Sequence, residues 1–461
     1  MGTVTSVPHR PVILASNRGP ISFELGDDGS LRTKRGGGGL ITVVGGALEG
    51  TDATWLAAAL SDADEKAAEQ GVIDAEGYRV RTIVVEDLAG YYDVISNGTL
   101  WFLYHGLFDA PRRPRFDRVW RSAWDAYRRV NETFARAIAE DAPDGAAVLV
   151  QDYHLALVPG ALRALRDDVR IVHFHHTPFA GPDAMRMLPS DVAEELLHGL
   201  AAADACGFHD RRWASAFEAS CRELIGTVPR TYVSPAGADA EDIGKVAASD
   251  ACASKLRELD ELVGDRKLLV RVDRIELSKN IVRGFLAFED LLRTHPEWRE
   301  RVVFGAFVYP SREGLSEYLA YRTEVEGTIA RINEEWATPT WTPILYDAKD
   351  DFPRSVAALR RYDVLLVNPV RDGLNLVAKE GPIVNERDGA LVLSQESGVA
   401  GELGAVALMV NPFDIAATAD TLHAALSMSA EDRAAHSAAV RAAASARTPN
   451  DWFADQLQAA E

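Results

Sequence analysis

Asp372 and Glu380 are two carboxylates on either side of a glycine turn that leads into a helix-like segment. The apolar residues 362–367 precede the turn and have the pattern of a buried parallel strand. A turn from a strand into a helix leaves backbone N–H groups free at the start of the helix, and such groups bind phosphate. Segment 368–380 therefore predicts a nucleotide-sugar site, in which N–H groups bind the diphosphate and carboxylates bind hydroxyls.

Three cations follow other predicted strands. Arg274 and Lys279 stand five residues apart, just beyond the strand at 267–272. They are suited to hold a diphosphate, whereas the alternative is a solvated charged loop. The diphosphate is favoured because the Asp372 turn is predicted at the same edge of the same sheet. Arg312 follows the next strand and would bind a phosphate through two N–H groups, or form a surface ion pair instead.

Histidines follow the strands of the first half. His154 and His176 each come directly after one, and His173 and His175 lie within the second. His173 and His175 share a face of that strand, while His176 points away. No Glu or Cys stands at metal-ligand spacing nearby, so we predict no metal site. One histidine is expected to face the cleft, and the others to be buried and hydrogen-bonded.

Two further features have more than one interpretation. Tyr92 and Trp101 are nine residues apart and would stack on a sugar, or belong to the core. The glycine-rich segment 34–40 loses backbone entropy when it is ordered, which close approach to a ligand would justify. The alternative is a surface hairpin, because the segment fits neither the dinucleotide fingerprint nor the P-loop pattern.

Strands and helical patterns alternate along the whole chain, which predicts an α/β fold with parallel sheets and helices on both faces. At 461 residues the chain is too long for one core. Pro and Gly punctuate 233–239, so we place an N-terminal domain at 1–235 and a C-terminal domain at 236–439. A final helix within about 440–461, anchored by Trp452, is expected to pack back on the first domain. Ligands of such sheets bind at the carboxyl ends of the strands.

The composition excludes some classes of partner. Lys and Arg number 49 and Asp and Glu 69, so the net charge is 49 − 69 = −20. This argues against nonspecific binding of nucleic acid or of an anionic membrane. Three scattered cysteines, the lack of an apolar run near the ~20 residues that span a bilayer, and an N-terminus without a signal core predict a reduced, cytoplasmic protein. The oligomeric state stays open, a homo-oligomer included.

Taken together, these segments resemble glycosyltransferase family 20, the retaining trehalose-6-phosphate synthases. The block 371–380 is highly specific, and the other segments add to it in the family's order over nearly the whole chain. The matching segments are 16–18, 36–40, Tyr92, Trp101, 151–154, 176–179, Arg274, 278–279, 311–312, 371–380, 393–395 and 411–414.

The resemblance implies the GT-B fold, with two Rossmann-like domains and the active site in the cleft between them. It implies transfer of glucose from a nucleoside diphosphate glucose to glucose 6-phosphate, which gives α,α-trehalose 6-phosphate with retained configuration. No metal or other cofactor is implied. The implied mechanism is a front-face displacement, in which a phosphate oxygen of the leaving group takes the proton of the acceptor hydroxyl.

The resemblance also implies roles for residues that match the family's motifs. The implied donor-binding residues are Gly38, Gly39, Arg274, Lys279, Asp351, Asp372, Gly373, Asn375, Leu376, Val377 and Glu380. The implied acceptor-binding residues are Arg18, Tyr92, Trp101, Asp152 and Arg312, with the two arginines on the phosphate. The implied catalytic residues are Arg274, Lys279, Asp152, His176 and Asp372, with His176 beside the transferred glucose.

The chain departs from the family pattern in the helix after the turn. Gly381-Pro382 is expected to interrupt this helix, by a kink or a lost backbone bond, and to shift Glu380 slightly. The neighbouring 384–389 resembles pseudoglycosyltransferase relatives that join cyclitols, but those lack the full glycine-rich loop and the form of 371–373 found here. No phosphatase domain follows in this sequence, so the product is expected to leave as the phosphate.

A second departure concerns the nucleotide base. Asp347, Asp350 and Asp351 lie in a segment that borders the base in the family. Guanine presents two adjacent N–H donors to a carboxylate, and uracil presents one between carbonyls. We therefore predict GDP-glucose as the preferred donor over UDP-glucose; the alternative is that all three carboxylates face solvent.

Two other functions stay open at this point. One is a related enzyme with glycerol 3-phosphate or a cyclitol phosphate as acceptor, although Tyr92, Trp101 and Arg312 favour a hexose phosphate. The other is an inactive regulatory homologue that binds sugar phosphate. Such a homologue would be expected to lack Arg274, Lys279 or Asp372, and all three are present.

Overall fold

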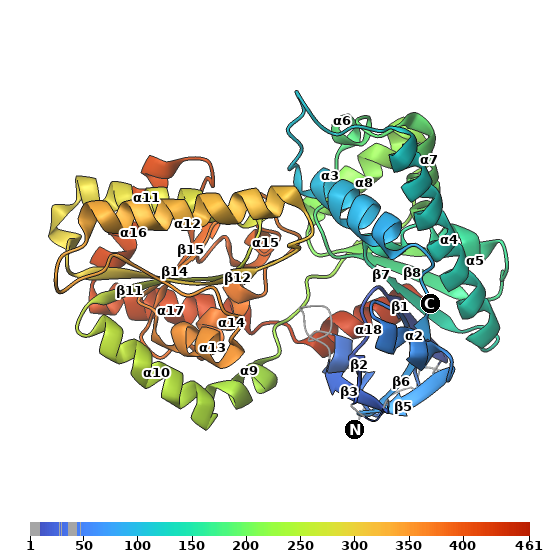
Figure 1. The fold of residues 1–461 in the computed structure, drawn as a ribbon, viewed down its shortest axis with the longest axis horizontal. Helices are drawn as coiled ribbons and strands as arrows, with labels where there is room; N and C mark the ends of the chain where they lie inside the picture. Colours follow the sequence, from blue (N-terminus) through green and yellow to red (C-terminus); the bar gives the residue numbers. More distant parts are fainter. Residues whose placement is uncertain (1–9, 27, 29, 36–43, 47) are drawn as a thin grey trace, which may run out of the picture. The chain divides into compact units, whose positions relative to one another are not determined.

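The computed structural model describes residues 10–26, 28, 30–35, 44–46 and 48–461 (Figure 1). The chain divides into two compact units. Unit 1 consists of Met1–Pro235 and Pro449–Glu461, and unit 2 of Ala236–Thr448. The chain returns to unit 1 at Pro449, later than the position near 440 that we expected. The reason is that α17 (Ala430–Ala444) still packs on helices of unit 2.

Unit 1 is built on a sheet with the strand order β10-β9-β8-β7-β1-β4-β6-β5, in which β5 alone pairs antiparallel. Its central strands are the apolar runs of the sequence, and β7 is buried at every position. Helices must therefore cover both faces. The strands are β1 (Val12–Ser16), β4 (Thr54–Ala58), β5 (Val72–Ala75), β6 (Tyr78–Ile83), β7 (Ala147–Gln151), β8 (Arg170–His175), β9 (Ala205–Phe208) and β10 (Thr231–Val233), and a separate hairpin consists of β2 (Ile21–Leu25) and β3 (Leu31–Arg35).

The helices of unit 1 begin and end where local chemistry favours it. Asp117 accepts a hydrogen bond from Trp120 N at 2.9 Å and so caps the N-terminus of α4. The apolar face of α4 is buried in the interior of unit 1. A wide π-helix, η1, leads into α3, and π-helices are frequent at functional sites. The helices are α2 (Asp62–Ala68), η1 (Ala89–Leu100), α3 (Trp101–His105), α4 (Arg118–Asp141), η2 (Tyr153–Leu155), α5 (Val158–Arg163), α6 (Pro182–Met185), α7 (Ser190–Ala201), α8 (Arg211–Leu224) and α18 (Pro449–Ala459).

Unit 2 is built on an all-parallel sheet with the order β13-β12-β11-β14-β15-β16. In Figure 1, α11, α12 and α16 lie on one face of this sheet, and α10, α13, α14 and α17 on the other. Its elements are α9 (Ala240–Ala247), α10 (Asp250–Val263), β11 (Lys267–Ile275), η3 (Leu277–Lys279), α11 (Ile281–Thr294), η4 (Pro296–Trp298), β12 (Val302–Pro310), α12 (Ser316–Trp336), β13 (Ile344–Tyr346), α13 (Phe352–Arg361), β14 (Val364–Val367), α14 (Val377–Val384), β15 (Ala390–Ser394), α15 (Ala400–Leu403), β16 (Leu408–Val410), α16 (Ile415–Ser427) and α17.

The last helix, α18, packs on unit 1. Trp452 is fully buried, with its ring centroid 4.9 Å from that of Phe174 on β8. Cys206, Cys221 and Cys252 are buried free thiols. Within the described ranges, none of the helices is both long and apolar enough to cross a membrane.

Candidate active site

The predicted phosphate-binding residues of unit 2 meet at one edge of its sheet. Strands β11 and β14 are neighbours, so the loops that follow them run side by side. Val370 N donates to Ser278 O at 2.8 Å, which joins the two loops. As a result Lys279 Nζ lies 2.5 Å from Asp372 Oδ2, and both side chains are 14% exposed.

Electrostatics keep Lys279 charged. Burial lowers the pKa of its ammonium, but the carboxylates of Asp372, Asp273 and Glu276 outweigh burial and hold the pKa above its ordinary value. The ammonium has three N–H donors, so it can bind Asp372 and an oxygen of a ligand together. Lys279 is therefore a preformed cation at this edge.

Asn375 joins Asp372 to the start of α14. Its Nδ2 donates to Asp372 Oδ2 at 3.1 Å, and its Oδ1 accepts from Ala378 N at 3.2 Å. The backbone φ of 88° at Asn375 lies in the left-handed region, where Asn is tolerated better than most residues. The N–H groups of Leu376 and Val377, which belong to the first turn of the helix, lie next in the chain, where an anion is favoured.

The Asp372-Gly373 turn is supported by a second turn that sequence reasoning missed. Gly398 N donates to Asp372 O at 3.0 Å, and Asp372 N donates to Glu396 O at 3.1 Å. A Cβ at Gly398 would lie only 1.8 Å from Gly373 O. Only glycine fits at residue 398, and the Ser397-Gly398 pair was the available signal.

Helix α14 is not interrupted at Gly381-Pro382 as expected: it continues through Pro382 to Val384. Proline lacks an N–H, so the helical bond from residue 382 to the Ala378 carbonyl is absent. The carbonyl of Pro382 itself accepts from Arg441 Nε at 2.9 Å. A Cβ at Gly381 would lie 2.5 Å from Leu365 Cδ2, so a larger residue here would require the Leu365 side chain to move. Burial raises the pKa of Glu380 on this helix to about 7, with a smaller contribution from Asp242.

Glu276 is a functional candidate that the sequence did not single out. It is fully buried, and its Oε2 lies 2.9 Å from Arg312 Nη1 and 3.4 Å from Arg274 Nη2. Ser278 Oγ donates to its Oε1 at 2.8 Å. One carboxylate therefore holds together the two arginines predicted to bind phosphate, which would otherwise repel each other.

The three aspartates predicted to border the nucleotide base of the donor have different surroundings. Asp351 caps α13 by accepting from Arg354 N at 3.0 Å. Asp347 forms ion pairs with Arg354 at 3.0 Å and Lys349 at 3.6 Å. Asp350 is exposed. Two of the three carboxylates thus already have partners in their own segment.

Residues predicted in unit 1 follow adjacent strands. Arg18 comes after β1, Asp152 directly after β7 and His176 directly after β8, and these strands are neighbours in the sheet. Arg18 Nη2 donates to Tyr92 OH at 3.3 Å, and Asp152 Oδ1 accepts from His176 N at 3.2 Å. Trp101 is 9% exposed, so most of its ring is buried. Gly38 and Gly39 lie outside the described residues.

His176 is held through both ring nitrogens. Nε2 lies 2.9 Å from Gln151 Oε1, and Nδ1 lies 3.1 Å from His209 Nε2. Burial, with His209 and His173 nearby, holds the pKa of His176 well below its usual range, so the ring is neutral at pH 7. His209, directly after β9, was not predicted.

The two histidines within β8 were predicted to be buried and hydrogen-bonded, and this is only partly confirmed. His173 and His175 are both 1% exposed. His175 Nε2 is 2.8 Å from Thr177 Oγ1, whereas neither ring nitrogen of His173 has a hydrogen-bond partner among the described residues. The expectation that both would be hydrogen-bonded is therefore wrong for His173, and burial lowers the pKa of this residue to about 3.

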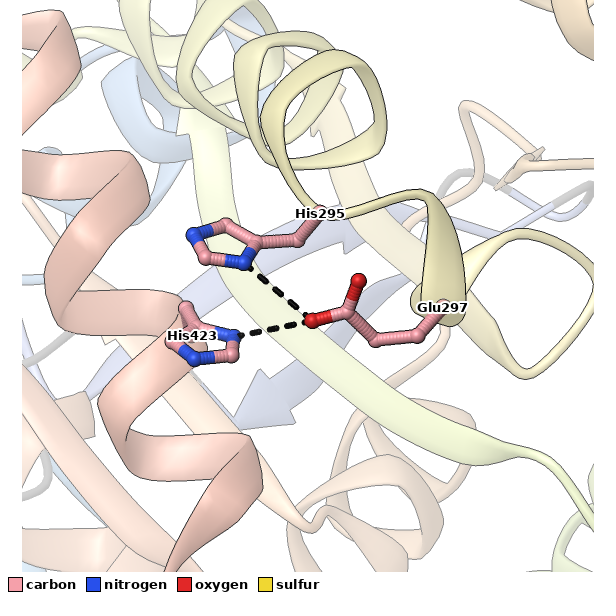
Figure 2. Close-up of side chains that lie close together, drawn as sticks. All are labelled: His295, Glu297 and His423. Atoms are coloured by element: carbon pink, nitrogen blue, oxygen red, sulfur yellow. Dashed lines mark hydrogen bonds and ion pairs between the residues drawn. The ribbon is translucent and has the colours of Figure 1, made fainter.

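Figure 2 shows His295, Glu297 and His423, whose ligand atoms lie close enough together to suggest a cation. His295 Nδ1 is 3.2 Å from Glu297 Oε1 and must donate its proton to this carboxylate. His423 Nδ1 accepts from Trp298 Nε1 at 3.0 Å. The two imidazole rings also stack, with their centroids 3.6 Å apart and their planes at 8° to each other. The lone pairs in the ring planes therefore run parallel. Neither nitrogen offers a free lone pair, and the cluster is a hydrogen-bonded group at the end of α11.

Comparison with known proteins links this geometry to one family. The model of glycosyltransferase family 20 matches residues 10–461. A trehalose-6-phosphate synthase of Mycolicibacterium smegmatis is 33% identical over 476 residues, which cover 97% of this chain and 92% of the relative. A bifunctional trehalose-6-phosphate synthase/phosphatase of Thermoproteus tenax is 34% identical over 76% of this chain, and the chain spans about half (48%) of its length.

Solved structures agree. The trehalose-6-phosphate protein from E. coli bound with UDP-2-fluoro glucose has a TM-score of 0.84 and 29% identity, over 97% of this chain and 99% of that one. A UDP-forming α,α-trehalose-phosphate synthase from Burkholderia xenovorans in complex with glucose-6-phosphate also has a TM-score of 0.84 and 29% identity. The match covers 98% of this chain and 99% of that one. The prediction of a GT-B fold with two Rossmann-like domains is confirmed.

Proposed function

Because the chain belongs to glycosyltransferase family 20, we propose that it transfers glucose from a nucleoside diphosphate glucose to glucose 6-phosphate. The products are α,α-trehalose 6-phosphate and the nucleoside diphosphate. The observation that supports this most directly is the contact between Lys279 and Asp372 beside the first turn of α14. It combines a fixed cation, free N–H groups and a carboxylate, which are the groups that a nucleotide sugar requires.

In the proposed mechanism, Arg274, Lys279 and the N–H groups of Leu376 and Val377 stabilise the negative charge of the leaving diphosphate. The bond between glucose C1 and the phosphate oxygen breaks while a bond from C1 to the acceptor hydroxyl oxygen forms on the same face. The hydroxyl proton moves to the departing phosphate oxygen. Donors that are already in place contribute most to such charge stabilisation.

The remaining donor contacts are to hydroxyls. Asp372, Gly373 and Asn375 bind the transferred glucose, and Glu380 binds the ribose. Support comes from Asn375, which orients the carboxylate of Asp372 at 3.1 Å. Because Asp372 is held from two sides, by Lys279 and Asn375, its oxygens keep a defined direction toward a ligand.

The acceptor phosphate is assigned to Arg18 and Arg312, and Tyr92, Trp101 and Asp152 bind the acceptor sugar. Arg312 is 12% exposed and is fixed by Glu276, which makes it a rigid partner for one phosphate. The solved relative from B. xenovorans is described in complex with glucose-6-phosphate. Glycerol 3-phosphate or a cyclitol phosphate is the alternative acceptor.

The preference for GDP-glucose over UDP-glucose stays a prediction. Among the three aspartates, Asp350 is the carboxylate that the described contacts leave exposed, so the preference now depends chiefly on it. UDP-glucose is the alternative donor, and it is favoured by solved relatives that bind a UDP sugar or are named UDP-forming. The cytoplasmic location also stays a prediction.

One assay matrix tests the proposal. GDP-glucose and UDP-glucose are each combined with glucose 6-phosphate, glycerol 3-phosphate and a cyclitol phosphate, and the released nucleoside diphosphate is measured. We expect turnover with glucose 6-phosphate, and NMR of the product should show an α,α linkage. No release with any of the three acceptors would contradict the proposed function.

A further inference from the structure

The last helix of the chain reaches the strand ends that position His176. Gln456 and Trp452 on α18 are four residues apart, so they lie on one face of the helix. Both side chains are fully buried. Gln456 Oε1 accepts from Gln151 Nε2 at 2.9 Å, across 305 residues of sequence. This contact connects the last helix to Gln151 and, through it, to His176.

The hydrogen bonds form one directed chain. Because Gln151 uses its amide nitrogen for Gln456, its Oε1 faces His176 Nε2 at 2.9 Å. A carbonyl oxygen only accepts, so His176 Nε2 carries the proton and Nδ1 is bare. His209 Nε2, 3.1 Å away, then donates to that bare nitrogen. The amide orientation of Gln151 thus determines the tautomer of two histidines.

Trp452 restricts the ring itself. Its centroid lies 5.5 Å from that of His176 and 6.5 Å from that of His209. Phe174, the residue two before His176, packs edge-on against the same indole at 4.9 Å. Rotation of the His176 ring would require displacement of this buried cluster, which is costly in a closely packed interior.

We propose that Gln456 and Trp452 are positioning residues of the transferase, which fix the ring and the Nε2–H tautomer of His176 through Gln151. In this arrangement both ring nitrogens of His176 are engaged within unit 1, so the residue exchanges no proton during the reaction. The link to catalysis rests on the proposed function, with His176 beside the transferred glucose as the family resemblance implies. The tautomer is a property of the protein alone. Helix α18 therefore supports the proposed active site indirectly, through Gln151 and His176, and is not proposed to contact a ligand.

Gln456→Met tests this inference, since methionine has a similar length and no amide. In the variant Gln151 is free to rotate, and we expect the ¹⁵N spectrum of histidine-labelled enzyme to change for His176 from Nε2–H to a mixture of tautomers. The value of kcat should fall about fivefold to tenfold, the loss that one hydrogen bond typically causes, with both KM values unchanged within about twofold. A His176→Asn variant assigns the signal.

Two control variants separate positioning from simple loss of stability. Gln458 is exposed on the same helix, so Gln458→Met should change neither spectrum nor rate. Gln456→Glu keeps an oxygen that accepts from Gln151 in either protonation state, so it should retain the Nε2–H tautomer and most of kcat, even if its Tm falls. An unchanged His176 spectrum in Gln456→Met, or a rate loss that follows Tm in both Gln456 variants, would overturn the proposal. Wild-type enzyme that shows the tautomer but no turnover would instead contradict the proposed function.

Discussion

Lys279 Nζ lies 2.5 Å from Asp372 Oδ2, although the two residues are 93 positions apart in the chain. The contact exists because β11 and β14 are neighbours and both end at this edge. Asp372 is further oriented by Asn375, so cation, carboxylate and helix start form one unit. A ligand that binds there meets groups that need little reorganisation, which is the condition under which charge stabilisation is most effective.

Replacement of Lys279 by Met should therefore lower kcat/KM about 10²–10³-fold, the usual effect of the loss of one preorganised donor. The measurement is steady-state release of nucleoside diphosphate. Lys245→Met is the matched control, because Lys245 is 67% exposed and forms a surface ion pair with Glu241 on α9. Equal rates for the two variants would remove Lys279 from the leaving-group site.

Glu276→Gln should destabilise unit 2. The change removes the carboxylate that Arg312 and Arg274 share and leaves two cations side by side. Breaking a buried ion pair costs about 3–5 kcal/mol, and the exposure of Arg274 reduces this to about 2 kcal/mol. Urea unfolding measures the difference. Glu313→Gln, at an exposed pair with Arg322, should stay within about 0.5 kcal/mol of wild type.

Glu380 predicts a pH-dependent stability. Its pKa is raised to about 7 in the folded protein by burial, from an ordinary value of 4.5. The folded state keeps the proton where the unfolded state has lost it, so this group reduces stability as the pH rises from about 4.5 to 7, and the loss is complete above pH 7.

Glu380→Gln should therefore be more stable relative to wild type at pH 8 than at pH 5, by at most about 3 kcal/mol. Urea unfolding at the two pH values measures this, with Glu431→Gln, exposed on α17, as the control. The same variant should raise the KM for the donor. A pH-independent difference in stability would show that Glu380 is ionised normally.

Gly398→Ala should damage the Asp372 turn from outside the ligand site. The new Cβ would lie 1.8 Å from the backbone oxygen of Gly373, which cannot move aside as a flexible side chain can. We expect at least a tenfold loss of kcat/KM and a destabilisation of about 1–3 kcal/mol. Activity and Tm are the measurements.

Gly244→Ala is the matched glycine control for this change. Among the described residues, no heavy atom beyond its chain neighbours and its own helix backbone lies within 4 Å of its Cβ position on α9. This variant should keep full activity and gain up to about 1 kcal/mol of stability, because alanine favours the helix. Similar losses in both variants would mean that the packing at Gly398 is not special.

Asp350→Asn tests the nucleotide preference. If its carboxylate accepts from guanine, the variant should lose about 10- to 100-fold in kcat/KM for GDP-glucose, because hydrogen bonds to charged groups contribute about 1.5–3 kcal/mol. The rate with UDP-glucose should stay unchanged and is the internal control. A wild-type enzyme that prefers UDP-glucose would refute the prediction.

The sequence by itself determined the architecture and which strand ends carry the proposed site residues. Alternating apolar runs and amphipathic segments identify parallel strands and covering helices, because burial on two faces produces that pattern locally. Polar residues directly after the strands of one sheet then share an edge of that sheet, because parallel strands end on the same side. Asp152 and His176 do so in unit 1, and Lys279 and Asp372 follow neighbouring strands of unit 2. The order of these segments also sufficed to indicate the family.

Only the tertiary structure decided which of those residues contact each other. Glu276 stands beside Arg274 in sequence, but its bond to Arg312 depends on the packing of β11 against β12. Gln456 meets Gln151 across 305 residues, and the start of α18 at Pro449 depends on how far α17 packs on unit 2. Pro382 stays within its helix, whose last turn receives a hydrogen bond from Arg441 Nε to Pro382 O. Such contacts depend on side-chain packing between distant elements, which has no period in the sequence and therefore cannot be deduced from it.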